Sequence, residues 1–340
     1  MKLRPAWTCV ALVATAVLVT FLPSRRSMGT APVGNGVRIG LVFDVGGRGD
    51  KSFNDSAYEG LARAERELGA RASFLEPVGS EDREAALRLF AARHLDLVIA
   101  VGFIFTSDVD AVARAYPDVH FACVDYAGAE ASMPPNVEGL SFREEEGSFL
   151  VGAVAGLVSR THHVGFVGGM TIPLIRKFEA GYGAGVRAAC PLCTVHVAYA
   201  GSTPDAFKDP ARGRSLAAFE IAAGADVLFH ASGATGHGVF EGAREARALA
   251  IGVDADQYDE LPGTVLTSMV KRVDVAVYDA IAQTAKGHFQ AGMRVLGLAE
   301  HGIDYVHEGP HAAGLSDTVK QRVEELRAEV IRGARRVPSE

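Results

Sequence analysis

Residues 37–61 read VRIGLVFDVGGRGDKSFNDSAYEGL, and this stretch predicts the local unit from which the fold is built. Val37–Phe43 is a short and mainly apolar run, which is typical of a strand buried on both faces. Residues 54–56 (NDS) supply N-cap chemistry for a helix with apolar residues at helical spacing, and Gly69 ends that helix. A buried strand, a loop and an amphipathic helix in this order indicate a parallel α/β sheet.

The same alternation continues along the chain and restarts near its middle. The strands expected after the first are 71–75, 96–101, 119–124, 164–167, 195–199, 227–231 and 250–253. Helical stretches separate these apolar runs, so two successive doubly wound units, each covered by helices on both faces, are predicted. Beyond them we expect one long helix over 267–286, an extended segment over 297–306 and a final charged helix over 316–333.

Length and composition set the outer bounds. The chain has 340 residues, of which 48% are hydrophobic, and this allows two or three domains with well-buried cores. Asp and Glu total 41 against 34 Lys and Arg, and this acidic balance argues against a nucleic-acid partner.

The N-terminus has the order of a secretory signal. Lys2 and Arg4 precede an uncharged apolar run that Pro23 ends, and the run is at the lower limit of what can span a bilayer. We therefore expect residues 1–23 to be a signal peptide or an N-terminal membrane anchor, followed by a linker over 24–36. The predicted location is the periplasm or the outer face of the cytoplasmic membrane.

The cysteines do not form a disulfide scaffold at this chain length. Cys9 lies before most of the apolar run, whereas a lipoprotein cysteine should follow it, so lipidation there is not expected. Cys190 and Cys193 form a CxxC pair with no second pair, which disfavours zinc and leaves a surface-loop pair that is either free or bridged locally. Cys123 lies in an apolar strand and is expected to be a buried small hydrophobe.

Polar residues follow several of the predicted strands. Asp44, Asp125 and Asp254 each end a strand, and they come from both halves of the chain. Ligands of open α/β sheets bind outside the carboxyl ends of the strands, so these aspartates indicate a cleft shared by two lobes. The alternative role for each of them is that of a helix N-cap.

Six blocks of sequence, in order, resemble a known family, the BMP/PnrA solute-binding components of ABC importers. The resemblance extends from about Val37 to Pro338. The blocks are 44–61 (DVGGRGDKSFNDSAYEGL), 165–170 (GFVGGM), 176–186 (RKFEAGYGAGV), 224–243 (GADVLFHASGATGHGVFEGA), 251–257 (IGVDADQ) and 265–281 (VLTSMVKRVDVAVYDAI).

The resemblance implies an α/β type I periplasmic-binding-protein fold, with two doubly wound parallel-sheet lobes joined by hinge crossovers. Lobe 1 would comprise 37–141 and 268–298, and lobe 2 would comprise 142–267 and 299–340. The family often holds a purine nucleoside in the cleft between the lobes.

In lobe 1, the resemblance implies that Asp44 and Asn54 bond polar atoms of the base or sugar and that Phe53 lies against the base. Asp125 matches the family's aspartate at the end of the fourth strand. Tyr126 follows it where a glycine is common, which could narrow the pocket.

In lobe 2, the resemblance implies that Phe178 supplies a second aromatic wall and that the Gly233 loop lets the backbone approach the ligand. Asp254 and Lys271 would hold the ribose hydroxyls, and Lys271 would neutralise the buried Asp254 carboxylate. Without the resemblance, the residues alone favour core aromatics as the role of Phe53 and Phe178.

The sequence thus predicts an exported or membrane-tethered solute-binding protein that closes around a small polar ligand, expected to be a purine nucleoside, and delivers it to an ABC permease. No enzymatic activity, cofactor or metal is expected. A Gly47–Ser52 phosphate loop is excluded because Asp50 stands before Lys51. Two alternatives stay open: a ligand sensor that signals to a membrane receptor or kinase, and a Rossmann-type enzyme acting on a nucleoside.

Overall fold

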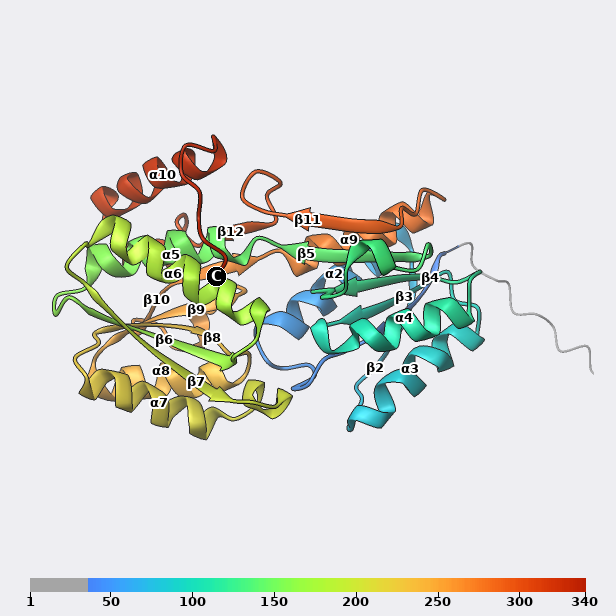
Figure 1. Cartoon of the computed structure of the whole chain (residues 1–340), viewed down its shortest axis with the longest axis horizontal. Coiled ribbons are helices and arrows are strands. Elements are labelled where there is room, and N and C mark those ends of the chain that lie inside the picture. Colours follow the sequence, from blue (N-terminus) through green and yellow to red (C-terminus); the bar gives the residue numbers. More distant parts are fainter. Residues whose placement is uncertain (1–35) are drawn as a thin grey trace, which may run out of the picture. The chain divides into compact units, whose positions relative to one another are not determined.

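The computed structural model describes residues 36–340. The predicted leader (1–23) and nearly all of the predicted linker lie outside the described residues. The described part contains two six-stranded sheets, each with helices on both of its faces (Figure 1). The predicted α/β architecture with two doubly wound, largely parallel sheets is confirmed.

The first sheet is entirely parallel. Its strands, in spatial order, are β11 (Gly292–Leu296), β5 (Val137–Phe142), β4 (His120–Val124), β3 (Leu97–Val101), β1 (Arg38–Val42) and β2 (Arg71–Leu75). Helices α2 (Phe53–Leu68) and α9 (Val273–Ala285) pack together on one face, and α3 (Ser80–Ala92) and α4 (Thr106–Ala115) cover the other. The central strand β3 is buried along its whole length, as an apolar run between two helical layers should be.

The second sheet repeats this plan with one antiparallel edge strand. Its order is β12 (Ile303–Tyr305), β10 (Val265–Lys271), β9 (Leu249–Asp254), β8 (Val227–Ala231), β6 (His163–Met170) and β7 (Thr194–Gly201), and β12 runs antiparallel to β10. Helices α5 (Glu144–Val158) and α6 (Pro173–Ala189) cover one face and α7 (Pro210–Ala222) and α8 (Thr235–Ala246) the other, while α10 (Asp317–Ile331) packs on α5. We call each sheet with its helices a lobe.

The chain passes between the lobes at three places: Arg143, Arg272 and the segment 297–302. Backbone hydrogen bonds join these crossings, because the Arg143 N–H donates to Leu296 O (3.0 Å) and the Arg272 N–H donates to Gly302 O (2.8 Å). Chain segments that cross side by side can act together as a hinge.

The predicted single helix over 267–286 is wrong. Residues 265–271 form the strand β10, which is buried between β9 and β12, and the helix α9 begins only at Val273. The strand therefore belongs entirely to the second lobe. Strands β5 and β11 were also missed, because pairing with distant segments, and not local spacing, makes these residues extended.

The three cysteines within residues 36–340 lie as the sequence indicated, and Cys9 lies outside the described residues. Cys190 and Cys193 form a disulfide in the short connection between α6 and β7, so the locally bridged alternative is the one observed. Cys123 is buried in β4 and free.

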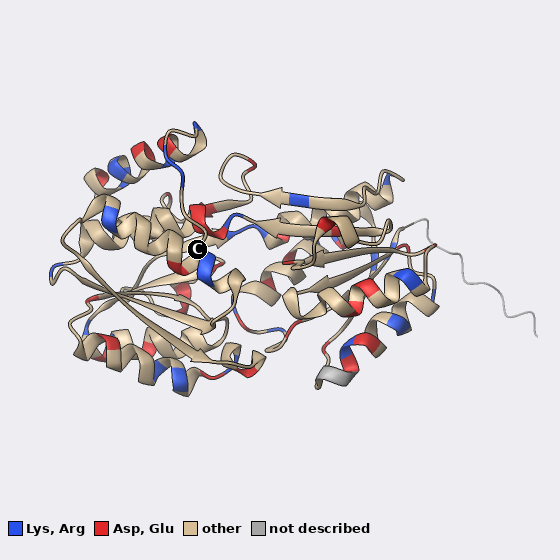
Figure 2. Ribbon diagram, in the orientation of Figure 1, with Lys and Arg blue, Asp and Glu red and all other residues tan. Residues whose placement is uncertain are grey.

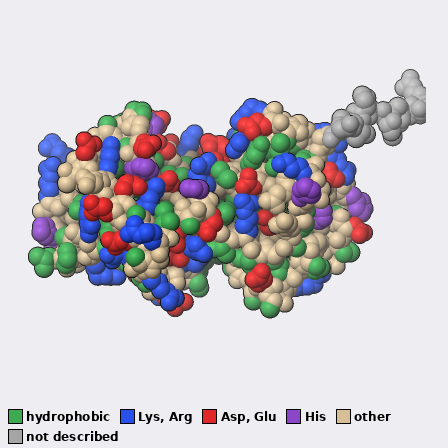
Figure 3. Space-filling view, turned by 90° about the horizontal axis from the view of Figure 1, so that it is seen from above, with side chains coloured by type: hydrophobic (Ala, Val, Ile, Leu, Met, Phe, Trp, Pro, Cys, Tyr) green, Lys and Arg blue, Asp and Glu red, His purple; other side chains and the backbone are tan. Residues whose placement is uncertain are grey.

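Charged residues lie mainly in the helices and loops, and the strands carry few of them (Figure 2). On the face seen in Figure 3, both signs of charge are interspersed with hydrophobic and polar side chains. No helix within residues 36–340 is both long enough and apolar enough to cross a membrane.

Candidate functional site

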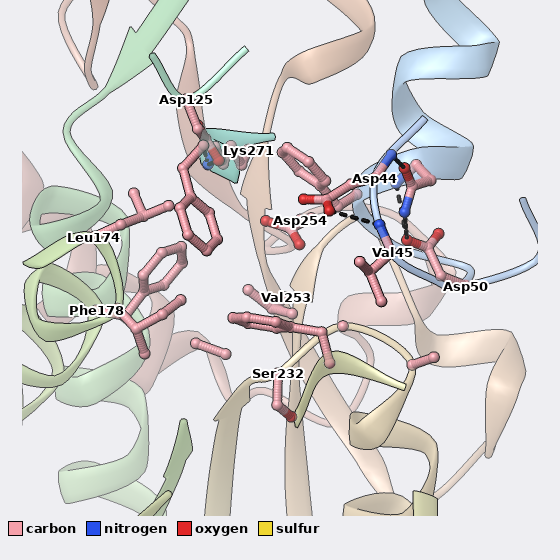
Figure 4. Close-up of a pocket in the computed structure, with 18 residues that line it drawn as sticks. Asp44, Val45, Asp50, Asp125, Leu174, Phe178, Ser232, Val253, Asp254 and Lys271 are labelled. Carbon is pink, nitrogen blue, oxygen red and sulfur yellow. Dashed lines mark hydrogen bonds and ion pairs between the residues drawn. The ribbon is translucent and has the colours of Figure 1, made fainter. Parts of the chain in front are cut away.

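A pocket lies between the lobes, at the carboxyl ends of the parallel strands, where open α/β sheets bind their ligands. All eight residues that the sequence nominated line it: Asp44, Phe53, Asn54, Asp125, Phe178, Gly233, Asp254 and Lys271. In Figure 4, Asp44, Val45 and Asp50 face Leu174 and Phe178 across the pocket, with Asp125 and Lys271 on a third side.

The strand ends bring the charged groups together. Asp44 follows β1, Asp125 follows β4, Asp254 ends β9 and Lys271 ends β10. Asp125 and Asp254 have φ angles of 59° and 66°, a left-handed conformation that few residues other than glycine adopt. Such conformations concentrate at functional sites, where the surrounding structure holds them.

On the first lobe, Asp44 and Asp50 in the loop after β1 and Asn54 in the first turn of α2 form a cluster, which we call the loop cluster. The Asp44 N–H donates to Asn54 Oδ1 (3.0 Å), and Asn54 Nδ2 donates to Asp50 Oδ2 (3.0 Å). The Val45 N–H donates to Asp44 Oδ1 (2.5 Å). Burial raises the pKa of Asp44 to about 7, although the bond from Val45 opposes this shift.

A second group, which we call the hinge cluster, consists of Asp125, Glu144, Lys177 and Lys271. Lys271 Nζ lies 2.7 Å from Asp125 Oδ1 and 3.1 Å from Glu144 Oε1, and Lys177 Nζ lies 3.0 Å from Glu144 Oε2. Charges of alternating sign therefore run from the first lobe to α6. Burial alone would lower the pKa of Lys271, but Asp125, Glu144 and Asp254 raise it above its ordinary value.

Lys271 was expected to neutralise Asp254, but its direct partners are Asp125 and Glu144. Asp254 instead accepts a hydrogen bond from Ser52 Oγ at 2.8 Å, and Ser52 Oγ also lies 3.1 Å from Val253 O. Ser52 is completely buried, and this contact joins the two lobes. Burial raises the pKa of Asp254 to about 6, and Lys271 and Ser52 oppose that shift.

Aromatic side chains supply the apolar surface of the pocket. The ring centroids of Phe53 and Phe178 lie 5.2 and 5.8 Å from Lys271 Nζ. Phe103 and Phe207 also line the pocket, and their rings meet edge to face across the lobes with centroids 6.4 Å apart.

Phe103, Phe207 and Asp50 line the pocket but are not among the eight nominated residues. Phe103 follows Gly102 at the end of β3, where the strand-end rule points, and Phe207 lies in the 3-10 turn after β7. Asp50 had a weaker signal, as an acidic residue just before a predicted helix.

One pair of side chains near the pocket resembles a nucleophile and its base. Ser232 Oγ lies 3.3 Å from His230 Nδ1, and His230 Nε2 lies 3.2 Å from Gln257 Oε1. Burial lowers the pKa of His230 to about 3, so this imidazole is a poor acceptor for the serine proton near neutral pH. The arrangement therefore gives little support to hydrolytic chemistry.

Comparison with known proteins gives a consistent picture. The model of the family described as PnrA-like ABC transporter substrate-binding protein (Bmp) matches residues 37–335. The chain is similar to an uncharacterized lipoprotein of Pyrococcus horikoshii, with 34% identity over 315 residues, 90% of this chain and 77% of the relative. It is also similar to the ABC transporter nucleoside-binding protein BmpA of Lactococcus lactis, with 29% identity over 359 residues and 98% of each chain.

Among solved structures, an ABC transporter solute-binding protein from Aeropyrum pernix K1 superposes with a TM-score of 0.81 at 30% identity. The match covers 89% of this chain and 94% of that chain.

Proposed function

The chain belongs to the PnrA-like family of ABC transporter substrate-binding proteins, and we propose that it captures a purine nucleoside by closing its two lobes around it. The observation that carries the proposal is the convergence of the eight nominated residues on one interlobe pocket. The name of the Lactococcus lactis relative, a nucleoside-binding protein, supports the choice of ligand.

The pocket offers a polar edge and apolar walls, which is what a neutral heterocycle needs. Asp44 and Asn54 would bond the edge of the base, and Phe53, Phe178 and Phe207 would lie against its faces. An aromatic pair contributes roughly 0.5–1.5 kcal/mol beyond the burial of its area.

Asp254 would hold the ribose. Its Oδ2 accepts the bond from Ser52, and its Oδ1 has no hydrogen-bond donor within residues 36–340. A carboxylate oxygen can accept hydrogen bonds from sugar hydroxyls, as the acidic residue of dinucleotide sites does. Lys271 is held by Asp125 and Glu144 and would contribute to ribose binding mainly by its charge.

The charges in the pocket favour a nucleoside over a nucleotide. Four aspartates line the pocket (Asp44, Asp50, Asp125 and Asp254), and Lys271 is the one cationic side chain among its lining residues. A phosphate group would face carboxylates across a partly dehydrated space, which is energetically unfavourable.

We place the protein outside the cytoplasm, held at the membrane through its N-terminal segment and delivering its ligand to an ABC permease. The family description implies the permease, and the name of the Pyrococcus horikoshii relative, a lipoprotein, supports membrane attachment.

Thermal melting of the purified protein with a panel of ligands tests the proposal. Inosine, guanosine or adenosine should raise the melting temperature, and Asp254→Ala should abolish that shift while the protein stays folded. The ligand assignment would be wrong if a sugar or a peptide raised the melting temperature and no nucleoside did.

A further inference from the structure

Asp50 is a buried carboxylate whose partners are all N–H groups. Its side chain is 4% exposed, and no Lys, Arg or His within residues 36–340 forms an ion pair with it. Oδ1 accepts from the backbone N–H groups of Ser52 (3.0 Å) and Asp55 (3.1 Å). Oδ2 accepts from the backbone N–H of Asn54 (2.9 Å) and from Asn54 Nδ2 (3.0 Å).

The last of these bonds and the bond from the Asp44 N–H together settle which way the Asn54 amide faces. Its Oδ1 meets the Asp44 N–H, which can only donate, and its Nδ2 meets Asp50, which as a carboxylate can only accept. If the Asn54 amide were flipped, its NH2 group would face the Asp44 N–H, and its oxygen would face the Asp50 carboxylate. The bond to Asp50 uses one of the two hydrogens on Asn54 Nδ2. Because Asn54 lines the pocket beside Asp44, the other hydrogen is left for a ligand.

We propose that Asp50 is a positioning residue that fixes the Asn54 amide, so that the pocket presents an acceptor on Asp44 beside a donor on Asn54. This narrows the class of ligand, in a step that rests on the proposed function. The pocket selects bases that carry a hydrogen-bond donor and a hydrogen-bond acceptor on neighbouring atoms of one edge. Inosine has such an edge, with an N–H beside a carbonyl. Purine riboside lacks both groups.

A purely structural role for Asp50 would be to cap the start of α2 and no more. Asp55 provides a matched control for that role, because its carboxylate accepts from the backbone N–H groups of Gly49 (2.9 Å) and Lys51 (3.1 Å) in the same loop. The Asp55 carboxylate makes no hydrogen bond to Asn54.

The test compares dissociation constants for inosine and purine riboside by titration calorimetry at pH 8, where Asp44 is mainly ionised. The unmutated protein should bind inosine about tenfold more tightly or better, since two hydrogen bonds distinguish the ligands. Asp50→Asn removes one acceptor oxygen and should reduce this ratio to about threefold or less, whereas Asp55→Asn should preserve it.

A double-mutant cycle separates positioning from capping. In an Asn54→Leu background, Asp50→Asn should change the inosine to purine riboside ratio no further, because the amide through which Asp50 acts is gone. The proposal is overturned if Asp50→Asn weakens both ligands equally and leaves the ratio intact, which would be the result for a cap alone.

A ligand-free measurement keeps the test independent of the proposed function. The side-chain amide protons of Asn54 should exchange slowly with solvent by NMR in the unmutated protein and in Asp55→Asn, and quickly in Asp50→Asn. Fast exchange in the unmutated protein would refute the fixed amide. If exchange is slow but neither ligand binds, the fixed amide stands and the nucleoside function, together with the selectivity drawn from it, is wrong.

Discussion

The loop cluster and the hinge cluster both bury carboxylates beside the same pocket, but they stabilise them differently. The loop cluster comes from eleven consecutive residues, 44–54, and satisfies Asp50 with N–H groups alone. The hinge cluster takes its four side chains from β10, α5, α6 and the end of β4, and balances them with charge. A local cluster keeps its geometry as the lobes move, whereas the contact from Asp125 to Lys271 joins two lobes and depends on closure.

The largest effect that distinguishes the clusters should come from Lys271→Met. This change leaves Asp125 and Glu144 buried without their shared cation and should lower the free energy of unfolding by about 3–5 kcal/mol. Urea unfolding measures it. Lys177→Met is the matched control, because Lys177 is 32% exposed and its loss should cost clearly less.

Adding Asp125→Asn to Lys271→Met should recover part of the lost free energy of unfolding, because the buried negative charge of Asp125 is then removed as well. A loss below about 1 kcal/mol for Lys271→Met alone would show that the hinge cluster behaves like a solvated surface pair.

A smaller effect is expected for Ser52→Ala, which removes the hydroxyl that contacts Asp254 across the lobes. One hydrogen bond contributes about 1 kcal/mol, so nucleoside affinity should fall by roughly fivefold. Ser56→Ala is the control, because Ser56 bonds the N–H of Asp274 within the first lobe. If both variants weaken affinity equally in titration calorimetry, the interlobe contact has no special role.

A separate effect is a change in how stability depends on pH. Burial raises the pKa of Asp44 to about 7 and that of Asp254 to about 6, from 3.8, so the folded protein binds more protons than the unfolded chain over this interval. Their contribution to stability is therefore present below about pH 4 and is lost as the pH rises towards 7.

In ligand-free Asp44→Asn, the free energy of unfolding should fall less steeply between about pH 4 and 7 than in the unmutated protein. Equal slopes in urea titrations across this interval would mean that Asp44 titrates in the folded protein as it does in the unfolded chain.

Much of the fold and the pocket could be predicted from the sequence, because both depend on patterns that are local along the chain. Apolar runs such as Leu97–Val101 revealed the buried strands, and Asp44, Asp125 and Asp254 marked where those strands end. The resemblance then selected the remaining nominated residues, and all eight line one pocket.

The remaining features depend on contacts between distant segments. The strand β10 is extended because β9 and β12 pair with it, whereas the apolar spacing continued into the helix that follows and led to the prediction of one helix. The partners of Lys271 are set by the meeting of four elements, which no spacing encodes. Asp50 was visible in the sequence, but its bond to the Asn54 side chain required the geometry of the loop.

Titration calorimetry of inosine and inosine 5′-monophosphate, on protein unfolded and refolded to remove any co-purified ligand, tests the central claim most directly. The proposed site predicts that inosine binds with one-to-one stoichiometry and that the monophosphate binds at least about tenfold more weakly, because its phosphate would meet carboxylates. Absence of inosine binding, or equal or tighter binding of the monophosphate, would contradict the account.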